Sequence, residues 1–289
     1  MMADHRQRQH RVQVDDLVFD VREWGPSNGE PLLALHGFPQ CAASWDGLGR
    51  RLAEAGIRTI AFDQRGYSAG ARPPLDTYTL EAVVADALGV ADGLGLGRFH
   101  LCGFGNGAMQ SWELAASAPE RVRSLTALRF PHPRAFALAV AADAEQRAQW
   151  SALEKMHPPV PAARALLADN GRGLREFLHR SGMPPQEVER TASRVGEEDV
   201  LAAALAWHLI PLERMAEVDR TPVPTLYIWT DGPALTRATA ACCGDHVAGE
   251  FRTLTLPGIG HWMLETAADR LAGPITTHVQ ATGSSTEAS

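Results

Sequence analysis

The stretch Leu101-Cys102-Gly103-Phe104-Gly105-Asn106-Gly107-Ala108-Met109 places three alternate glycines between two different hydrophobic patterns. A mostly apolar run over 98–102 enters it, and apolar residues compatible with a helix, Met109, Trp112, Leu114 and Ala115, leave it. A short apolar run followed by helical periodicity is typical of a strand and then a helix. The stretch therefore predicts a strand, a sharp turn and a helix.

The glycines have the spacing of G-x-S-x-G, in which the middle residue is a nucleophile held at a strained strand-to-helix turn. Gly103 and Gly107 match the small residues that let strand and helix approach each other. The middle position is Gly105, which has no side chain and adopts unusual backbone angles at little cost. A dinucleotide-binding loop or a flexible turn is the alternative interpretation of such glycines, and the rest of the chain decides between them.

The composition is that of a globular protein that binds small molecules. The 289 residues, 45% of them hydrophobic, suffice for one large α/β domain or for a core with an inserted subdomain. The net charge of -7 is interspersed, which favours neither nucleic acid nor an anionic membrane as a partner. A polar N-terminus and the absence of a long apolar run predict a cytoplasmic protein. We expect a monomer or a homodimer. The four cysteines lack C-x-x-C pairs, so we expect free thiols, no metal and no cofactor.

Outside this stretch, predicted strands and helices alternate along most of the chain. Two strands form a hairpin within 12–24, and further strands are predicted at 31–35, 58–62, 98–102, 122–128, 225–229 and 251–256. Helices are predicted at 44–54, at 79–94, after the glycines, at 235–242 and from about 261. Such alternation favours a doubly wound, mostly parallel sheet.

The alternation stops at Pro131, and from there to about Val218 the pattern is helical, punctuated by prolines and without a convincing strand. This predicts a helical lid at 131–218, inserted between the two parts of an α/β core at 1–130 and 219–280. The last residues, 281–289, are small and polar and are predicted to be disordered.

Four further motifs carry a resemblance to a known family: His36-Gly37-Phe38-Pro39, Asp63-Gln64-Arg65-Gly66-Tyr67-Ser68, Pro131-His132-Pro133 and Pro257-Gly258-Ile259-Gly260-His261-Trp262. Together with 102–108 they resemble the oxyanion loop, the D-x-R-G turn, the lid entrance, the catalytic-histidine loop and the nucleophile elbow of the α/β-hydrolase family. The epoxide hydrolase and haloalkane dehalogenase branch is the most similar. The resemblance implies a mostly parallel eight-stranded sheet with helices on both faces and an inserted lid.

The sequence departs from that branch where covalent chemistry takes place. Members carry aspartate at the apex, often in G-H-D-W-G, whereas this chain has Gly105 followed by Asn106, so the nucleophile and the halide-holding tryptophan are both missing. Dehalogenation by that route is excluded. Epoxide opening also needs acidic phenols in the lid, but the segment that resembles N-W-Y has Trp207 and His208, and Trp150-Ser151 stands near the second tyrosine position.

The rest of the catalytic pattern is partly retained. By resemblance, His261 is the catalytic base, and the backbone N–H groups of Phe38 and Asn106 form the oxyanion hole. Asp231 either orients His261 or is a loop residue without that role. A base and an oxyanion hole without a nucleophile can abstract a proton and stabilise an enolate, phenolate or alkoxide. They cannot form an ester intermediate through residue 105.

Residues at the strand ends and in the lid are expected to contact a substrate. Arg129, at the end of a predicted central strand, either binds an anionic or phenolic group or pairs with the lid. Cys102, on the strand before the turn, is predicted to be a small buried hydrophobe. The full substrate-binding set that we predict is His36, Gly105, Arg129, Trp150, Trp207, His208 and Trp262.

Three functions fit these residues. The first, favoured by the retained His261 and His36-Gly37 loops, is a lyase, cyclisation, isomerisation or water-addition step on an apolar small molecule. By analogy with other enzymes that reuse this fold, natural-product biosynthesis is its expected setting. The second is a hydrolase in which His261 activates water. The third is a non-catalytic ligand-binding or scaffolding protein.

Overall fold

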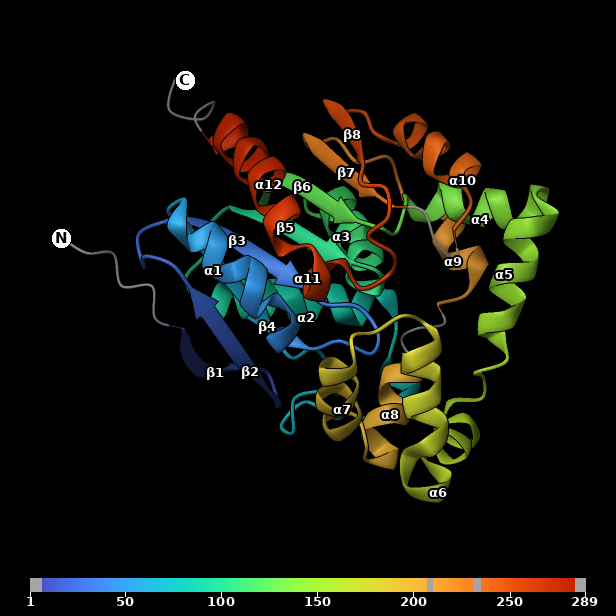
Figure 1. The fold of residues 1–289 in the computed structure, drawn as a ribbon. Coiled ribbons are helices and arrows are strands. Elements are labelled where there is room, and N and C mark those ends of the chain that lie inside the picture. The colour runs from blue at the N-terminus through green and yellow to red at the C-terminus, as the bar shows by residue number, and fades with distance from the viewer. Residues whose placement is uncertain (1–6, 207–209, 231–234, 284–289) are drawn as a thin grey trace.

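The computed structural model describes residues 7–206, 210–230 and 235–283, which form an eight-stranded sheet with helices on both faces (Figure 1). The strand order is β1-β2-β4-β3-β5-β6-β7-β8; β1 and β2 form an antiparallel hairpin, β2 pairs antiparallel with β4, and the other pairs are parallel. The predicted fold class is confirmed. The strands are β1 (Arg8–Val14), β2 (Leu17–Trp24), β3 (Glu30–Leu35), β4 (Ile57–Phe62), β5 (Phe99–Phe104), β6 (Val122–Leu128), β7 (Thr225–Trp229) and β8 (Phe251–Thr255).

The central strands are apolar throughout because both of their faces are buried. In β3, Leu33 and Leu35 pack into one hydrophobic cluster, whereas Leu32 and Ala34 pack into another on the opposite face. Successive side chains of a strand point to opposite faces, so a continuous apolar run supplies both cores. The first cluster is covered by α2 (Leu80–Gly93) and α3 (Asn106–Ser117), and the second by α1 (Asp46–Glu54), α11 (Met263–Thr266) and α12 (Ala268–Gly283).

Six helices follow β6 before the chain returns to the sheet at β7. They are α4 (Pro133–Ala142), α5 (Ala144–Glu154), α6 (Pro159–Arg180), α7 (Pro185–Arg194), α8 (Glu198–Ala206) and α9 (Leu212–Ala216). Apolar residues of α6, α7 and α8, including Leu178, Val188 and Leu201, form a third hydrophobic cluster. These helices lie on the side to which the central strands point (Figure 1). No helix within the described ranges has the length and apolar character needed to cross a bilayer.

The C-terminal boundary differs from the sequence prediction. Disorder was predicted from residue 281, but α12 continues to Gly283. The hydroxyl of Thr282 donates to the carbonyl of His278, and Val279 is buried in the second cluster. The small polar residues here therefore bond to backbone carbonyls of the helix, and the helix continues. Residues 284–289 lie outside the described part.

One helix boundary after β7 also differs. The helix predicted at 235–242 begins at Arg237 as α10 (Arg237–Ala241), and a 3₁₀ segment, η3 (Cys242–His246), continues it. The side chain of Thr236 accepts a hydrogen bond from the Thr239 N–H. This N-cap fixes the first turn of the helix. Apolar periodicity does not reveal the position of an N-cap, so it places the start of the helix less precisely.

Four histidines, His36, His100, His132 and His278, are buried among the described residues, and burial lowers the pKa of each. Three of them have the following ring contacts, and His100 Nε2 also lies 3.7 Å from the Glu30 carboxylate. His36 Nε2 accepts from the Gln64 N–H, His100 Nδ1 lies 2.8 Å from the Ser124 hydroxyl, and His132 Nε2 lies 3.0 Å from the Asp219 carbonyl. In each, burial lowers the pKa to about 3. The folded protein therefore holds all three rings neutral at mild acid pH.

We expect the free energy of unfolding to fall steeply below about pH 6.5. Between about pH 6.5 and pH 3 the unfolded chain binds protons at these histidines that the folded chain does not, so acid favours unfolding. Glu265 opposes this effect, because burial raises its pKa to about 7 and the folded state holds its extra proton between pH 7 and 4.5. For these three histidines and Glu265 the net uptake of about two protons corresponds to a loss of ~3 kcal/mol per pH unit near pH 5. The lowered pKa of His278 adds to this loss in the same direction.

Urea unfolding between pH 5 and pH 8 measures this slope. His100→Asn, which keeps a polar atom near the Ser124 hydroxyl, should reduce the slope by about one proton. The control is His157→Asn, because His157 is exposed on the lid. A flat stability profile between pH 8 and pH 5 would show that the buried histidines do not control acid stability.

Candidate active site

The turn after β5 has the backbone geometry of an elbow. Gly105 has φ 55° and ψ −121°, its N–H donates to the Leu128 carbonyl at 3.1 Å, and its carbonyl accepts from the N–H groups of Ala108 and Met109. These bonds tie the turn to the neighbouring strand β6 and to the first turn of α3. A left-handed φ of this kind favours glycine, which explains why the strained apex is held without a bulky residue.

The two flanking glycines are required by close backbone approach. A Cβ at Gly107 would lie 2.1 Å from the Leu35 carbonyl oxygen, and one at Gly103 would lie 2.3 Å from the Gly107 carbonyl oxygen. The apex itself is different, because a Cβ at Gly105 would meet only the Cα of Gly37, at 3.8 Å. The backbone is thus closely packed at Gly103 and Gly107, whereas there is space for a side chain at Gly105.

Above the apex lies a cavity of about 240 Å³. The sheet domain contributes Gly105, Asn106 and Met109 from the elbow, and the loop after β3 contributes Phe38 and Pro39. Most of the remaining lining is apolar or aromatic, with Arg129, Ser181 and His261 as polar members. The other residues are Phe130, Pro131, Phe136, Trp150, Leu153, Phe177, Met215, Leu235 and Trp262. A cavity of this kind accepts a largely apolar molecule with a few polar groups.

His261 lines this cavity from the loop between β8 and α11. Its ring packs edge-on against Phe104, at 5.6 Å between ring centroids, and against Trp262, at 4.7 Å. The indole Nε1 of Trp262 donates to the Ser181 carbonyl at 2.9 Å. The histidine loop is therefore attached both to the elbow strand and to the lid.

Arg129 lines the same cavity at the end of β6. Its φ is +71°, its N–H donates to the Ile228 carbonyl at 2.8 Å, and its carbonyl accepts from the Tyr227 hydroxyl. The side chain is only 5% exposed, and burial lowers the pKa of the guanidinium to about 10. The group remains a cation at neutral pH in mostly apolar surroundings.

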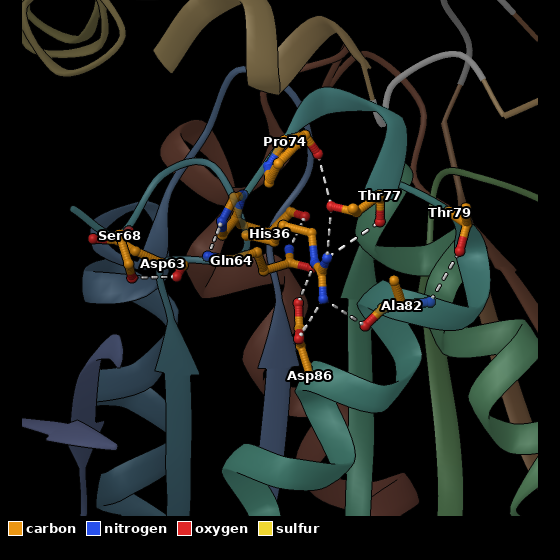
Figure 2. Close-up of polar contacts among 10 residues, drawn as sticks. His36, Asp63, Gln64, Ser68, Pro74, Thr77, Thr79, Ala82 and Asp86 are labelled. Atoms are coloured by element: carbon orange, nitrogen blue, oxygen red, sulfur yellow. Dashed lines mark hydrogen bonds and ion pairs between the residues drawn. The ribbon is translucent and has the colours of Figure 1, made fainter. Parts of the chain in front are cut away.

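His36 does not line the cavity, which corrects its assignment to substrate binding. Its ring is fully buried, with Nδ1 2.9 Å from the Gly37 carbonyl and Nε2 accepting from the Gln64 N–H at 3.1 Å. Figure 2 shows this ring directed at Gln64, whose side-chain amide donates back to the His36 carbonyl. His36 therefore joins the loop after β3 to the turn after β4.

The turn after β4 is fixed by a buried ion pair. The Arg65 guanidinium donates to both carboxylate oxygens of Asp86, at 2.7 and 2.8 Å, and to the Thr77 carbonyl. Asp86 and Thr77 are labelled in Figure 2. Ser68 donates to the Asp63 carbonyl in the same figure. Bidentate pairs of this kind fix geometry as well as charge. The D-x-R-G motif therefore fixes the turn after β4 to the start of helix α2 and the segment before it.

Of the substrate-binding residues predicted between β6 and β7, Trp150 lies in the described part of the structure, whereas Trp207 and His208 do not. Trp150 lines the cavity from α5, and its Nε1 donates to Glu154 at 2.9 Å. Trp207, His208 and Asp231 lie outside the described residues. Cys102 is fully buried, and burial raises the pKa of its thiol well above the usual range, as expected for a small hydrophobe.

Several residues near the cavity were not predicted from the sequence. Phe177 and Ser181 come from the end of α6, where no motif marks them. Glu265 lies four residues after His261, near Ser44 and Gln40, with the raised pKa noted above. An acidic residue directly after a catalytic-histidine loop is a possible sequence signal, but its burial is visible only in the fold.

Sequence comparisons relate this chain to α/β hydrolases. A profile of the alpha/beta hydrolase fold matches residues 30–153. The AB hydrolase superfamily protein YfhM of Bacillus subtilis is 31% identical over 42% of this chain, but the match spans only 43% of that protein. Epoxide hydrolase A of Mycobacterium tuberculosis is 28% identical over 87% of this chain and 91% of its own length.

Structural comparisons give the same fold over nearly the whole chain. An epoxide hydrolase from metagenomes of hot environments superposes with a TM-score of 0.82 and 24% identity, covering 94% of this chain and 98% of that one. The Bacillus megaterium epoxide hydrolase in complex with an inhibitor superposes with a TM-score of 0.80 and 21% identity, covering 94% of this chain and 100% of that one. At these identities the likeness establishes the fold.

Proposed function

The chain is an α/β-hydrolase-fold protein that resembles epoxide hydrolases, and from this premise we propose that it is an enzyme that works without a covalent intermediate. His261 is the general base, the backbone N–H groups of Phe38 and Asn106 stabilise a developing oxyanion, and the substrate is a largely apolar small molecule. Lyase, cyclisation, isomerisation and water addition are the reaction types that this arrangement serves. A cytoplasmic location and residues 131–218 as the lid belong to the same proposal.

The observation that carries the proposal is the cavity over Gly105. His261, Phe38 and Asn106 line one cavity with the apex, and a Cβ at Gly105 would find ordinary van der Waals space. The space for a nucleophilic side chain is therefore present at Gly105, but the nucleophile is missing. His261 and the backbone of Phe38 and Asn106, which do not depend on that side chain, still line the cavity.

The chemistry assigns one role to each group. His261 removes a proton from a carbon or hydroxyl of the substrate, and the electron pair left behind moves onto an oxygen held by the two N–H groups. The protonated histidine then returns its proton to the rearranged product. Arg129, cationic and lining the same cavity, binds an anionic or phenolic group of the substrate, while the aromatic walls hold the apolar part.

A water-activating hydrolase is the second candidate, and the same open space at Gly105 supports it. In that mechanism His261 takes a proton from a water molecule beside the apex, and the water oxygen attacks an epoxide or ester directly. A single turnover in H₂¹⁸O separates the hydrolase from the lyase, cyclisation and isomerisation steps: these leave the product unlabelled, whereas hydrolysis and water addition both introduce ¹⁸O. A labelled product in which an ester or epoxide C–O bond has been broken identifies the hydrolase.

We expect no covalent adduct at the elbow and negligible turnover of generic covalent-mechanism substrates. Gly105 supplies no nucleophilic atom, and the buried thiol of Cys102 lies on the strand before the turn. The measurement is intact-protein and peptide mass spectrometry after incubation with a fluorophosphonate, styrene oxide and 1-bromobutane, with p-nitrophenyl acetate hydrolysis as the rate assay. An adduct on any residue from 103 to 107 would contradict the proposed mechanism.

A further inference from the structure

A second cavity, of about 170 Å³, lies on the other side of Pro39 from the first. Pro39 lines both, but the second cavity has a polar lining drawn from the core and from α7 of the lid. The core supplies Gln40, Cys41, Ala43, Ser44, Arg22 and Asp63, and α7 supplies Glu187, Arg190, Thr191 and Arg194. His261, Phe38, Asn106 and Arg129, to which we assign the proposed reaction, do not line the second cavity. The two cavities share only Pro39 among their described lining residues.

Gln40 is a buried polar side chain on the wall of this cavity. It is only 2% exposed, and neither its amide nitrogen nor its amide oxygen makes a hydrogen bond of normal geometry among the described residues. The Glu265 carboxyl is its partner within the protein: burial raises the pKa of Glu265, and a side-chain hydrogen bond with Gln40, outside normal geometry, opposes that rise. A buried primary amide without bonds of normal geometry costs free energy, so a ligand that bonds to it gains from that deficit.

Three guanidiniums line the cavity, and two of them share one carboxylate. Arg22 and Arg190 both reach Asp46, at 3.4 and 3.5 Å, and Arg50 approaches the same carboxylate at 3.8 Å from outside the cavity. These are long ion pairs, and one carboxylate cannot satisfy the five N–H donors of each arginine. Donors of Arg22 and Arg190 therefore remain for another anion.

The two acidic residues of the lining, Asp63 and Glu187, already have partners and do not occupy all the remaining N–H donors of Arg22 and Arg190. Asp63 is already engaged by the Ala42 N–H at 2.9 Å and by the Arg194 guanidinium. Glu187 is paired with Arg190 at 3.6 Å. Including Arg50, Asp46 and the buried Glu265 beside Gln40, four arginines face four carboxyl groups here, and burial raises the pKa of one of them, Glu265, to about 7.

We propose that this polar cavity is a second ligand site, which binds a small oxyanion, a carboxylate or a phosphate, through Arg22, Arg190 and the Gln40 amide. Guanidinium groups match the geometry of both anions. Because its walls come from the loop of residues 39–44 and from α7, the bound anion holds the lid against the core. The occupant also restrains Pro39, next to the residue whose N–H we assign to the oxyanion hole.

Isothermal titration calorimetry at low ionic strength, with inorganic phosphate and succinate as separate probes, tests the proposal without any assay of turnover. We expect saturable one-to-one binding of at least one probe with a Kd of about 1 mM or tighter, and a matching rise in Tm. Arg190→Ala and Gln40→Leu should each weaken binding by about tenfold or more. Whichever probe binds more tightly identifies the class of anion.

The matched control is Arg50→Ala, because Arg50 also contacts Asp46 but lies outside the cavity. It should leave the Kd unchanged. Arg190 is 56% exposed at its side chain, so its replacement leaves the core packing intact, and circular dichroism verifies folding of each variant. Failure of both probes to bind, or equal weakening in Arg50→Ala and Arg190→Ala, would overturn the second site while leaving the proposed reaction untouched.

Discussion

Gly107→Ala should prevent stable folding, whereas Gly105→Ala, two residues earlier, should yield a folded protein. The new Cβ at position 107 would lie 2.1 Å from the Leu35 carbonyl oxygen and 2.6 Å from that of His36. These are backbone atoms of β3 and of the loop after it, so no side-chain rotation relieves the contact. Helix α3 and strand β3 would have to separate.

The competing terms have known sizes. Alanine is favoured over glycine inside a helix by about 1 kcal/mol, whereas overpacking against backbone costs about 3 kcal/mol or more. At position 107 the cost of the clash exceeds the gain in helix propensity. At Gly105 the Cβ has room, and the cost is that of a left-handed residue, about 1–3 kcal/mol. Relief of the clash at position 107 also requires α3 to move away from β3, so we expect its cost to exceed that at Gly105 and to take up a large part of a domain's stability of about 5–15 kcal/mol.

Urea denaturation followed by circular dichroism measures both variants, with soluble yield as a first comparison. Gly95→Ala is a useful reference, because a Cβ there meets nothing within 4 Å although its φ is also positive, at +68°. It reports the backbone cost alone. If Gly107→Ala unfolds at the same urea concentration as Gly105→Ala, the close approach of α3 to β3 is not what fixes the elbow.

The fold could be predicted because its signals are local. The apolar run at 31–35 and the glycine stretch each specify an element by composition, and the structure places them as adjacent parallel strands, with Leu33 beside Leu101. Motifs at strand ends then meet at one edge of the sheet, as the carboxyl ends of parallel strands must. This brings Phe38, Gly105 and His261 to one cavity although they are far apart in sequence.

The remainder of the site depends on contacts that sequence does not encode locally. His36 is in the substrate-binding set predicted from the sequence, but it bonds with Gln64 of a different loop and is not among the residues that line the cavity. Phe177 and Ser181 reach the cavity only because the end of α6 lies against the core at this point. Helical periodicity shows which face of a helix is apolar, not which cavity that face will line.

His261→Ala should lower the rate on the true substrate by about 10²–10⁴-fold, the range expected when a general base is removed. Histidine is the side chain whose ordinary pKa allows proton removal near neutral pH. The substrate should still bind, because most of the cavity wall is built from other residues such as Phe136, Trp150 and Trp262. The loss should therefore fall on kcat and leave the Kd for substrate within about threefold.

A second variant distinguishes loss of the base from loss of shape. His261→Gln keeps a polar side chain of similar length against Phe104 and Trp262 but cannot accept a proton, so it should be as slow as His261→Ala. His179→Ala, in an exposed part of the lid, is the matched histidine control and should behave as wild type. Stopped-flow rates together with equilibrium binding separate the two parameters. If His261→Gln turns over normally while binding persists, His261 is a wall of the cavity, and the protein acts by binding and orienting its ligand.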